Sequence, residues 1–444
     1  MSSITIIGGG PAGLAAAHYL KKNKIEFLLY EASNRIGGNC ITLNVGDFYF
    51  DSGAHRLHDV DRDTTNIFKK LLKDDLMKID IGSQIFSNNQ FIDFPISPLN
   101  LLKFLGFRSF SIEGVKILFK MVFKKPEKND FKSLVTYKYG NKISNLFLLN
   151  YSEKLWGVSA EKLSQKISGK RLKGLDLKTF LIELIFGQSK KTKHLDGSFY
   201  YPKNGIGSLF EELANYIGNE KLFLNKKITQ INHSQQKINS IEINNEENIF
   251  VDELISSIPL NVFISKMNPP APKEIIDIVS QIKFRNVILV VLFLNKERIN
   301  FNGSMYFPSK EFPFTRIYEP KNRSDFMSPK NKTSLAIEIP CFSTDKIWND
   351  SDDIIISIIK DKLLSIKLIE SNLVIKSLVY RINNAYPVLE YNFENNINGL
   401  TNYLSEFKNL KILGRNGLFE YSHIHDQFIS ARNVIKEIKA KNNR

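Results

Sequence analysis

Three glycines near the N-terminus have the spacing of a turn that binds a phosphate group. Gly8, Gly10 and Gly13 follow the short β-branched run from Ile4 to Ile7 and open a segment rich in alanine and leucine. In such a turn the first glycine allows a tight bend, the second lets the backbone approach a pyrophosphate, and the third allows a helix to pack closely on a strand. The helix N-terminus then stabilises negative charge. The spacing predicts a dinucleotide site, and a glycine turn without a ligand is the alternative.

A carboxylate follows this turn at a fitting distance. Glu31 lies eighteen residues beyond Gly13, at the end of a second predicted strand over residues 26 to 30. At the end of a strand beside the glycine turn, a carboxylate accepts hydrogen bonds from ribose hydroxyls and repels a 2′-phosphate. Glu31 is therefore predicted to bind the ribose of a dinucleotide that lacks a 2′-phosphate.

Two further segments favour FAD over a nicotinamide dinucleotide. The run Arg35-Ile-Gly37-Gly38-Asn39 is followed by the run Gly53-Ala-His55-Arg56-Leu-His58. Paired glycines let the chain pass close to a cofactor and an arginine can reach its phosphates, whereas a nicotinamide dehydrogenase needs no such second segment. His55 and His58 are candidates for the flavin side of the site. Two hydrogen-bonded structural histidines are the alternative.

The pattern of apolar residues predicts the elements that position these side chains. A strand over 4–7, a helix over 11–22 and a strand over 26–30 form a βαβ unit. Amphipathic helices are expected from 99 to 123, and a mostly helical segment continues to about residue 187. Further along, helices are predicted over 208–217, 354–366 and 426–440, strands over 227–231, 238–243 and 252–257, and a strand-rich region over 284–340.

The composition is that of an ordinary globular protein. Hydrophobic residues make up 43% and charged residues 24% of the 444 residues, which argues against a disordered, collagen-like or disulfide-rich chain. Cys40 and Cys341 are too few for a disulfide framework or a zinc site, so we expect reducing surroundings and no metal. The net charge of +15 would suit a nucleic acid, an anionic membrane or an anionic substrate. Because basic residues are dispersed and no nucleic-acid-binding motif occurs, we expect no nucleic-acid partner.

The N-terminal residues do not have the pattern of a signal peptide. They lack a basic region followed by an apolar stretch of usable length. The most apolar stretch, Val287 to Leu294, is too short to cross a bilayer and is predicted to be a buried strand. These features predict a cytoplasmic protein.

The motifs and their order resemble those of a family of FAD-dependent enzymes that includes amine oxidases, protoporphyrinogen oxidase and UDP-galactopyranose mutase. The likeness is greatest to UDP-galactopyranose mutase and extends along the chain. Besides the runs 35–39 and 53–58, the similar segments are Tyr151 to Gly157, Phe314 to Lys321, Ala385 to Val388 and Gly414 to Tyr421, with Asp426 beyond them.

The resemblance implies an α/β fold with a discontinuous Rossmann-like FAD-binding domain over residues 1–90, 195–262 and 405–444. A helical insertion over 91–194 and an antiparallel-sheet substrate domain over 263–404 complete the expected architecture. The residues that the resemblance assigns to FAD are Gly8, Gly10, Pro11, Ala12, Gly13, Glu31, Arg35, Gly37, Gly38, Asn39, Gly53, His55, Ile228, Gly414, Arg415 and Asp426.

The resemblance also implies a substrate with a diphosphate, whose oxygens need cations and hydroxyl donors. Arg316 offers a guanidinium fork, and tyrosine hydroxyls donate hydrogen bonds without adding charge. An ion pair between Arg316 and Glu319, and tyrosines that merely fill a core, are the structural alternatives. The implied substrate-binding residues are Trp156, Arg171, Arg316, Tyr386 and Tyr421, and the implied catalytic residues are His55, His58 and Arg316.

The implied reaction is redox-neutral. Reduced flavin attacks the anomeric carbon, the nucleotide leaves, and the sugar opens and recloses with another ring size; NADH or NADPH is a candidate reductant. The chain departs from the mutase pattern between Arg171 and Tyr200, where an apolar segment and a basic run replace an arginine-bearing loop. It also has His423-Ile-His425 where the family has D-M-D. The identity of the sugar is therefore left open.

The alternative is an oxidoreductase of the same superfamily that takes a hydride from an apolar or polyisoprenoid substrate onto FAD. Apolar and basic residues at 99–125 and 177–187 favour it, and they allow peripheral contact with an anionic membrane. A buried helical face flanked by solvated lysines explains the same pattern. The sequence does not predict an oligomeric state.

Overall fold

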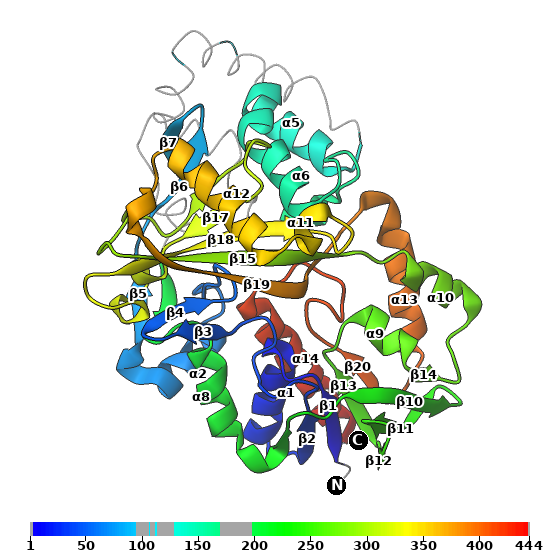
Figure 1. Cartoon of the computed structure of the whole chain (residues 1–444). Coiled ribbons are helices and arrows are strands. Elements are labelled where there is room, and N and C mark those ends of the chain that lie inside the picture. The colour runs from blue at the N-terminus through cyan, green and yellow to red at the C-terminus, as the bar shows by residue number, and fades with distance from the viewer. Residues whose placement is uncertain (1–2, 95–105, 107–111, 113–127, 169–197, 443–444) are drawn as a thin grey trace.

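A computed structural model describes residues 3–94, 128–168 and 198–442, together with residues 106 and 112 (Figure 1). Its central element is a parallel sheet whose five strands come from three distant parts of the chain, in the order β20-β13-β1-β2-β9. The predicted discontinuous, Rossmann-like α/β fold is confirmed. The strands are β1 (Ile4–Ile7), β2 (Phe27–Tyr30), β9 (Leu222–Phe223), β13 (Glu253–Ser256) and β20 (Leu410–Ile412).

Alternation of side chains along β1 and β2 explains why this sheet is covered on both faces. Ile4 and Ile6 pack into one core cluster and Ile7 into another, because successive side chains in a strand point to opposite faces. The first face is covered by α1 (Pro11–Lys22), α8 (Ser208–Ile217) and α14 (Ile424–Asn442), with α2 (Arg62–Leu72) packed beside them.

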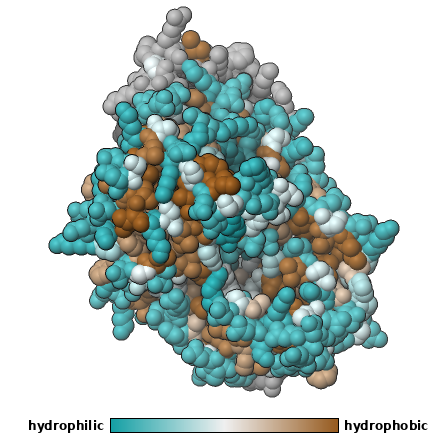
Figure 2. All heavy atoms as spheres, viewed as in Figure 1, coloured by the Kyte–Doolittle hydropathy of each residue, from teal (hydrophilic) through white to brown (hydrophobic). Residues whose placement is uncertain are grey.

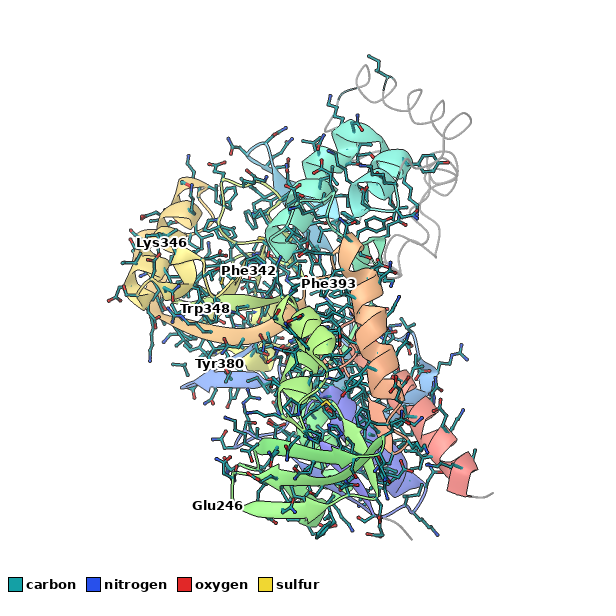
Figure 3. All side chains as sticks on the ribbon, turned by 90° about the vertical axis from the view of Figure 1, so that its right-hand side faces the viewer. Glu246, Phe342, Lys346, Trp348, Tyr380 and Phe393 are labelled. Atoms are coloured by element: carbon teal, nitrogen blue, oxygen red, sulfur yellow. The ribbon has the colours of Figure 1, made fainter. Side chains whose placement is uncertain are left out.

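The second face is covered by a smaller sheet and three short helices. The smaller sheet has the order β12-β11-β10-β14. Viewed from the side, α13 runs from the level of α6 (Asn150–Trp156) down to these strands (Figure 3). The elements are β10 (Ile228–Ser234), β11 (Lys237–Ile243), β12 (Glu247–Phe250), β14 (Met267–Asn268), α9 (Leu260–Ser265), α10 (Lys273–Ser280) and α13 (Glu394–Ser405).

A seven-stranded sheet, in the order β19-β15-β18-β17-β16-β6-β7, forms the other half of the molecule. Its neighbouring strands are antiparallel except for β16 and β6. Every residue of β15 after the first is buried, which confirms the buried strand predicted at Val287 to Leu294. The strands are β6 (Ser83–Ser87), β7 (Gln90–Phe94), β15 (Phe284–Leu294), β16 (Met305–Tyr306), β17 (Arg316–Tyr318), β18 (Thr333–Cys341) and β19 (Val374–Pro387).

The placement of β6 and β7 differs from the predicted partition of the chain. The sequence assigns most of this hairpin to the FAD-binding domain, whereas β6 pairs with β16 and joins the seven-stranded sheet. Phe86 packs into the core of that sheet, and burial of its ring favours this pairing. The domain boundaries themselves stay a prediction.

The remaining elements are helical or short. The helical segment predicted up to residue 187 is described only from 128 to 168, where α5 (Phe131–Ile143) leads through a π-helical turn into α6. Residues 99–105, 107–111, 113–127 and 169–187, which include nearly all of the amphipathic helices predicted from 99 to 123, lie outside the described part. Among the residues that the structure describes, no helix is long and apolar enough to cross a membrane. On the face shown in Figure 2, apolar residues form separate patches within a mainly hydrophilic surface.

The other elements are β3 (Thr42–Val45), β4 (Phe48–Asp51), β5 (Leu76–Ile79), β8 (Phe199–Pro202), α11 (Lys346–Asn349), α12 (Asp352–Ser365) and several single 3-10 turns.

Candidate functional site

The turn between β1 and α1 has the geometry that its three glycines predict. Gly8 has a positive φ of 99°, which favours glycine. A Cβ atom on Gly13 would lie 1.9 Å from the Gly8 carbonyl oxygen, so the helix could not pack as closely with any other residue there. A Cβ on Gly10 would have nothing nearer than the Cα of Gly38, at 3.8 Å. The backbone at Gly10 thus borders space that the protein itself leaves free.

The start of α1 is suited to an anion. No side chain caps its first turn, and no acidic residue lies there. Pro11 stands at the first helical position, where it has no amide hydrogen to leave unpaired. Gly414 has a positive φ, and a Cβ atom placed on it would lie 3.3 Å from the Cβ of Ala12. The C-terminal segment therefore packs against the same turn. The residues fit a dinucleotide pyrophosphate, because unpaired amide groups at a helix N-terminus favour negative charge.

Glu31 is held beside this turn. Its carboxylate accepts hydrogen bonds from the Gly9 amide at 2.6 Å and from the amide and hydroxyl of Ser33 at 2.9 and 2.8 Å. The Glu31 carbonyl accepts from the Lys226 amide at 2.8 Å, which brings the start of β10 alongside. Ile228 opens that strand, with its side chain buried in the core.

The segment from Arg35 to Asn39 lies across the glycine turn. The Gly37 amide donates to the Gly9 carbonyl at 2.8 Å, and a Cβ on Gly38 would lie 3.1 Å from the Cα of Gly10. Arg35 donates to the carbonyl of Gly38 at 2.8 Å and so closes its own turn. The Asn39 carbonyl accepts from Ser52 at 2.6 Å, which connects this segment to the one that carries His55.

His55 lies half-buried where the two halves of the molecule meet. Burial, and then the positive charges of Arg415, Arg316 and Arg323, lower the pKa of His55 to about 3. The imidazole is therefore neutral at physiological pH. Its Nδ1 lies 3.8 Å from the Cys40 sulfur.

The second predicted histidine faces the closing segment. The ring of His58 lies edge-on to that of His423, with centroids 5.7 Å apart. At the start of α14, the Asp426 carboxylate accepts from the His423 amide at 3.0 Å. Arg415 donates through Nε and Nη2 to the Ser422 carbonyl at 3.0 and 2.5 Å, which holds the closing segment in a compact turn.

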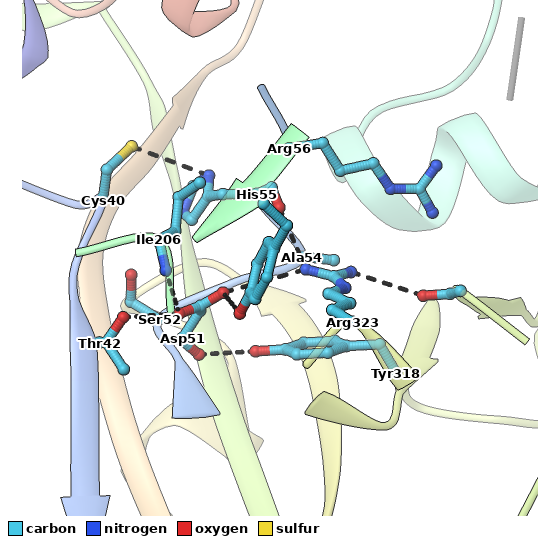
Figure 4. A network of polar contacts seen from close by, with 12 residues as sticks. Cys40, Thr42, Asp51, Ser52, Ala54, His55, Arg56, Ile206, Tyr318 and Arg323 are labelled. Carbon is cyan, nitrogen blue, oxygen red and sulfur yellow. Dashed lines mark hydrogen bonds and ion pairs between the residues drawn. The ribbon is translucent and has the colours of Figure 1, made fainter. Parts of the chain in front are cut away.

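The segment that carries His55 rests on a buried polar network that sequence reasoning missed (Figure 4). The Asp51 carboxylate is fully buried and accepts from Tyr201 at 2.6 Å, from Thr42 at 2.8 Å and from the Ile206 amide at 3.0 Å. Burial raises the pKa of Asp51 in spite of these donors. Asp51 lies two residues before Gly53 of the Gly53–His58 motif, so its position was a usable signal.

Arg316 forms an ion pair, but not with Glu319, the partner proposed from the sequence. Its Nε lies 2.9 Å from Oε2 of Glu338 and its Nη2 lies 2.8 Å from Oε1. Arg316 and Glu338 stand opposite each other on β17 and β18, whereas residues three apart in a strand point to opposite faces. Glu319 instead accepts from Thr333 and from the amides of residues 299 and 300.

Three aromatic side chains that the sequence assigned to the substrate come together. Trp156 from α6, Tyr386 from β19 and Tyr421 from the closing segment have ring centroids 5.5 to 6.4 Å apart. The Arg415 guanidinium lies 5.6 Å from the ring of Tyr386 and 5.4 Å from that of Tyr421. Burial raises the pKa of Tyr386 to about 12, so its hydroxyl is a hydrogen-bond donor at neutral pH. The remaining predicted substrate residue, Arg171, lies outside the described residues.

Helix α6 is fixed in place by the half-buried side chain of Lys154. The Lys154 ammonium donates to the carbonyls of Phe307, Ser309 and Phe314 at 2.6, 2.7 and 2.8 Å. Arg285 donates to the carbonyls of Lys154 and Leu155 near the end of the same helix. These contacts set the position of Trp156 against the seven-stranded sheet.

The site therefore combines a dinucleotide cradle, a neutral histidine, an arginine paired with a carboxylate, and a second arginine among tyrosines. The charge of Arg316 is matched by Glu338, whereas Arg415 donates to a carbonyl oxygen, which carries no net charge. The arrangement is suited to hold a dinucleotide beside an anionic group of a second ligand.

Comparisons with known proteins concern the family and the fold. The model of the flavin containing amine oxidoreductase family matches residues 11–298. Coproporphyrinogen III oxidase of Bacillus subtilis (strain 168) is 22% identical over 282 residues, which are 58% of this chain and 59% of that protein. The 4,4′-diapophytoene desaturase (4,4′-diaponeurosporene-forming) of Staphylococcus aureus (strain Newman) is 23% identical over 395 residues, 76% of this chain and 75% of that protein. A solved reduced UDP-galactopyranose mutase is similar in fold, with a TM-score of 0.83 and 18% identity over 99% of this chain and 96% of that one.

Proposed function

This chain belongs to the flavin-containing amine oxidoreductase family, and from that premise we propose that it isomerises the sugar ring of a nucleotide-diphospho-sugar between its pyranose and furanose forms. The chain is an FAD-dependent enzyme. The observation that carries the proposal is that Arg316, Tyr386, Tyr421 and Trp156 come together beside Arg415 and His55, the two residues assigned to the cofactor. These residues come from separate segments, and together they supply a guanidinium group and tyrosine hydroxyls, with the buried Trp156 indole packed edge-on against the two tyrosine rings.

This set matches the chemistry of a nucleotide diphosphate. Guanidinium groups and hydroxyl donors bind phosphate oxygens, and an aromatic face packs against a base or a sugar. Arg316 would meet the diphosphate with part of its charge already balanced by Glu338, which moderates binding and lets the nucleotide leave. A wholly apolar substrate would form no hydrogen bonds with these polar groups.

The residues that would hold FAD are the glycine turn, Glu31 and the closing segment from Gly414 to Asp426. When bound and reduced, FAD supplies a nucleophile for the anomeric carbon of the sugar. His55 is neutral and would adjust the polarity around the flavin. Tyr386 and Tyr421 would exclude water and orient the sugar, and the buried Trp156 would hold their rings in place, since isomerisation needs the reacting atoms held in one geometry.

The matched desaturase favours a second candidate. It is similar over three quarters of both chains, so an oxidoreductase that transfers a hydride from an apolar substrate to FAD is the alternative proposal. NADH or NADPH as reductant, a cytoplasmic location, the absence of a nucleic-acid partner and peripheral membrane contact all stay predictions.

The test is an anaerobic turnover experiment on the FAD-loaded protein. The flavin is reduced with dithionite, a panel of nucleotide sugars that includes UDP-galactopyranose is added, and products are separated by chromatography. We expect a ring-isomerised sugar only with reduced flavin and without net reoxidation. Absence of turnover on the panel, together with bleaching of the oxidised enzyme by an apolar donor, would favour the oxidoreductase.

A substitution at Arg316 tests the assignment of the diphosphate. Arg316→Lys keeps a positive charge opposite Glu338 but loses the guanidinium fork. We expect it to retain FAD and to bind UDP about 10- to 100-fold more weakly, which corresponds to one charge-assisted hydrogen bond of about 1.5–3 kcal/mol. Arg381→Lys is the matched control, because Arg381 lies in the same sheet and pairs with Asp352 on an exposed edge. Normal UDP binding by Arg316→Lys would remove Arg316 from the diphosphate site.

A further inference from the structure

Arg323 is a fully buried arginine that does not belong to any of the motifs. It follows the short helix Pro320–Asn322 on the side of the seven-stranded sheet. Its Nη1 donates to the His55 carbonyl at 3.1 Å and lies 4.0 Å from an Asp51 carboxylate oxygen. Its guanidinium therefore contacts both ends of the segment 51–55 (Figure 4).

A buried guanidinium is costly unless its charge is compensated. Here the Asp51 carboxylate balances the charge, and the guanidinium carbon lies 4.5 Å from the ring centroid of Tyr318 and 5.6 Å from that of Tyr201. Removing Arg323 alone would leave Asp51 buried without its counter-charge. The pair therefore acts as one unit.

Two residues of the seven-stranded sheet, together with Arg323, hold the backbone of segment 51–55 at three points. The Tyr318 hydroxyl donates to the Asp51 carbonyl at 2.6 Å. The Ala54 amide donates to Glu338 at 2.8 Å, and the His55 carbonyl accepts from Arg323. The position of His55 thus depends on the sheet that also carries Arg316, and not only on the FAD-binding half.

We propose that Arg323 is a positioning residue, which fixes the His55 imidazole beside the cofactor by holding the His55 carbonyl. The inference rests on the proposed function in one respect, namely that His55 lies at the flavin. Arg323 itself touches neither substrate nor cofactor. It acts through the backbone of His55, and its ion pair with Asp51 keeps the charge near that histidine balanced.

The test compares variants of the FAD-loaded protein by the midpoint potential and visible spectrum of the bound flavin. Arg323→Met removes the contact, and the double variant Asp51→Asn with Arg323→Gln keeps polar groups without buried charge if the single variant does not fold. We expect either variant to shift the potential and spectrum in the same direction as His55→Asn, and to weaken FAD binding about tenfold, as for loss of one hydrogen bond from a charged donor.

Lys321→Met is the matched control. Lys321 is a buried cation two residues away that donates to the carbonyls of Pro329, Lys330 and Lys332. We expect this variant to lower the thermal midpoint but to leave the flavin potential unchanged. A shift with Lys321→Met as large as with Arg323→Met would reduce Arg323 to a general stabilising role.

A second readout separates the positioning role of Arg323 from the role of His55 at the flavin. The ¹⁵N chemical shifts of the His55 imidazole report its surroundings without reference to the flavin. If these shifts and the flavin potential are both the same as in the parent protein when Arg323 is replaced, the positioning role is wrong. If His55→Asn leaves the flavin potential unchanged while the imidazole shifts respond to Arg323, the flavin role of His55 is wrong and the positioning role stands.

Discussion

Replacing Gly10 by alanine separates cofactor binding from folding. In the protein alone, the added methyl group would have no neighbour nearer than the Cα of Gly38, at 3.8 Å, which is an ordinary van der Waals contact. Gly10 has φ −75° and ψ −179°, a conformation that any residue adopts. Loss of unfolded-state freedom favours alanine by about 0.4–1 kcal/mol, and the weaker capping of α1 by alanine opposes it by a similar amount. We expect the stability of the apoprotein to change by less than about 1 kcal/mol.

The effect on FAD is expected to be far larger. The methyl group would occupy the space where a pyrophosphate approaches the start of α1, and it would prevent hydrogen bonds from the backbone amides. Loss of two hydrogen bonds to a charged group, at about 1.5–3 kcal/mol each, amounts to about 3–6 kcal/mol. The dissociation constant of FAD should then rise about 10²- to 10⁴-fold.

The assay is fluorescence titration of apoprotein with FAD, together with thermal unfolding of the same apoprotein. Gly13→Ala is the opposite control, because its methyl group would lie 1.9 Å from the Gly8 carbonyl oxygen and should destabilise the apoprotein by several kcal/mol. Gly82→Ala is the neutral control, since nothing lies within 4 Å of its Cβ position. The reasoning is refuted if folded Gly10→Ala binds FAD as the parent protein does, or if it unfolds as readily as Gly13→Ala.

Two further predictions concern His18 and Lys154, whose pKa values are lowered by burial. Burial and the charge of Lys22 lower the pKa of the His18 imidazole from 6.5 to about 4. As the pH falls below 6.5, the imidazole therefore binds a proton in the unfolded chain before it does so in the folded protein, and the folded protein loses stability. Between pH 7 and pH 5, the free energy of unfolding in urea should fall by about 2 kcal/mol less in His18→Gln than in the parent protein. Equal losses in the two proteins would contradict the lowered pKa of His18. Lys154→Met should lower the free energy of unfolding by about 2–4 kcal/mol and change the fluorescence of Trp156, because three carbonyls lose their donor. Lys310→Met, which removes an exposed ion pair to α6, should change neither quantity.

Much of the FAD-binding half could be predicted because its causes are local. The turn from Gly8 to Gly13 needs glycine for backbone reasons that operate within a few residues. Alternation in β1 and the apolar run at Val287 to Leu294 likewise reflect burial on one or both faces of a strand. The sequence by itself therefore determined the β1-α1-β2 unit, the cofactor turn and the buried strand β15 of the second sheet.

The candidate site depended on pairings across the chain, which local patterns do not contain. The partner of Arg316 is Glu338 because strand register brings position 338 opposite, while Glu319, three residues away, points to the other face. In the same way, only the paired strands show that β6 joins the sheet of β16. Register arises from the packing of whole sheets, so it is decided by the tertiary structure.

The clearest case is the network beneath His55. Asp51 stands beside a recognisable motif, but Arg323 follows a short helix and lies 272 residues further along the chain. A buried charge requires a compensating charge, yet the sequence does not show which of many arginines supplies it. The sequence by itself determined that a histidine motif follows the cofactor turn. Only the tertiary structure decided what holds that histidine in place, because desolvation of Asp51 and Arg323 occurs when the two halves of the molecule come together.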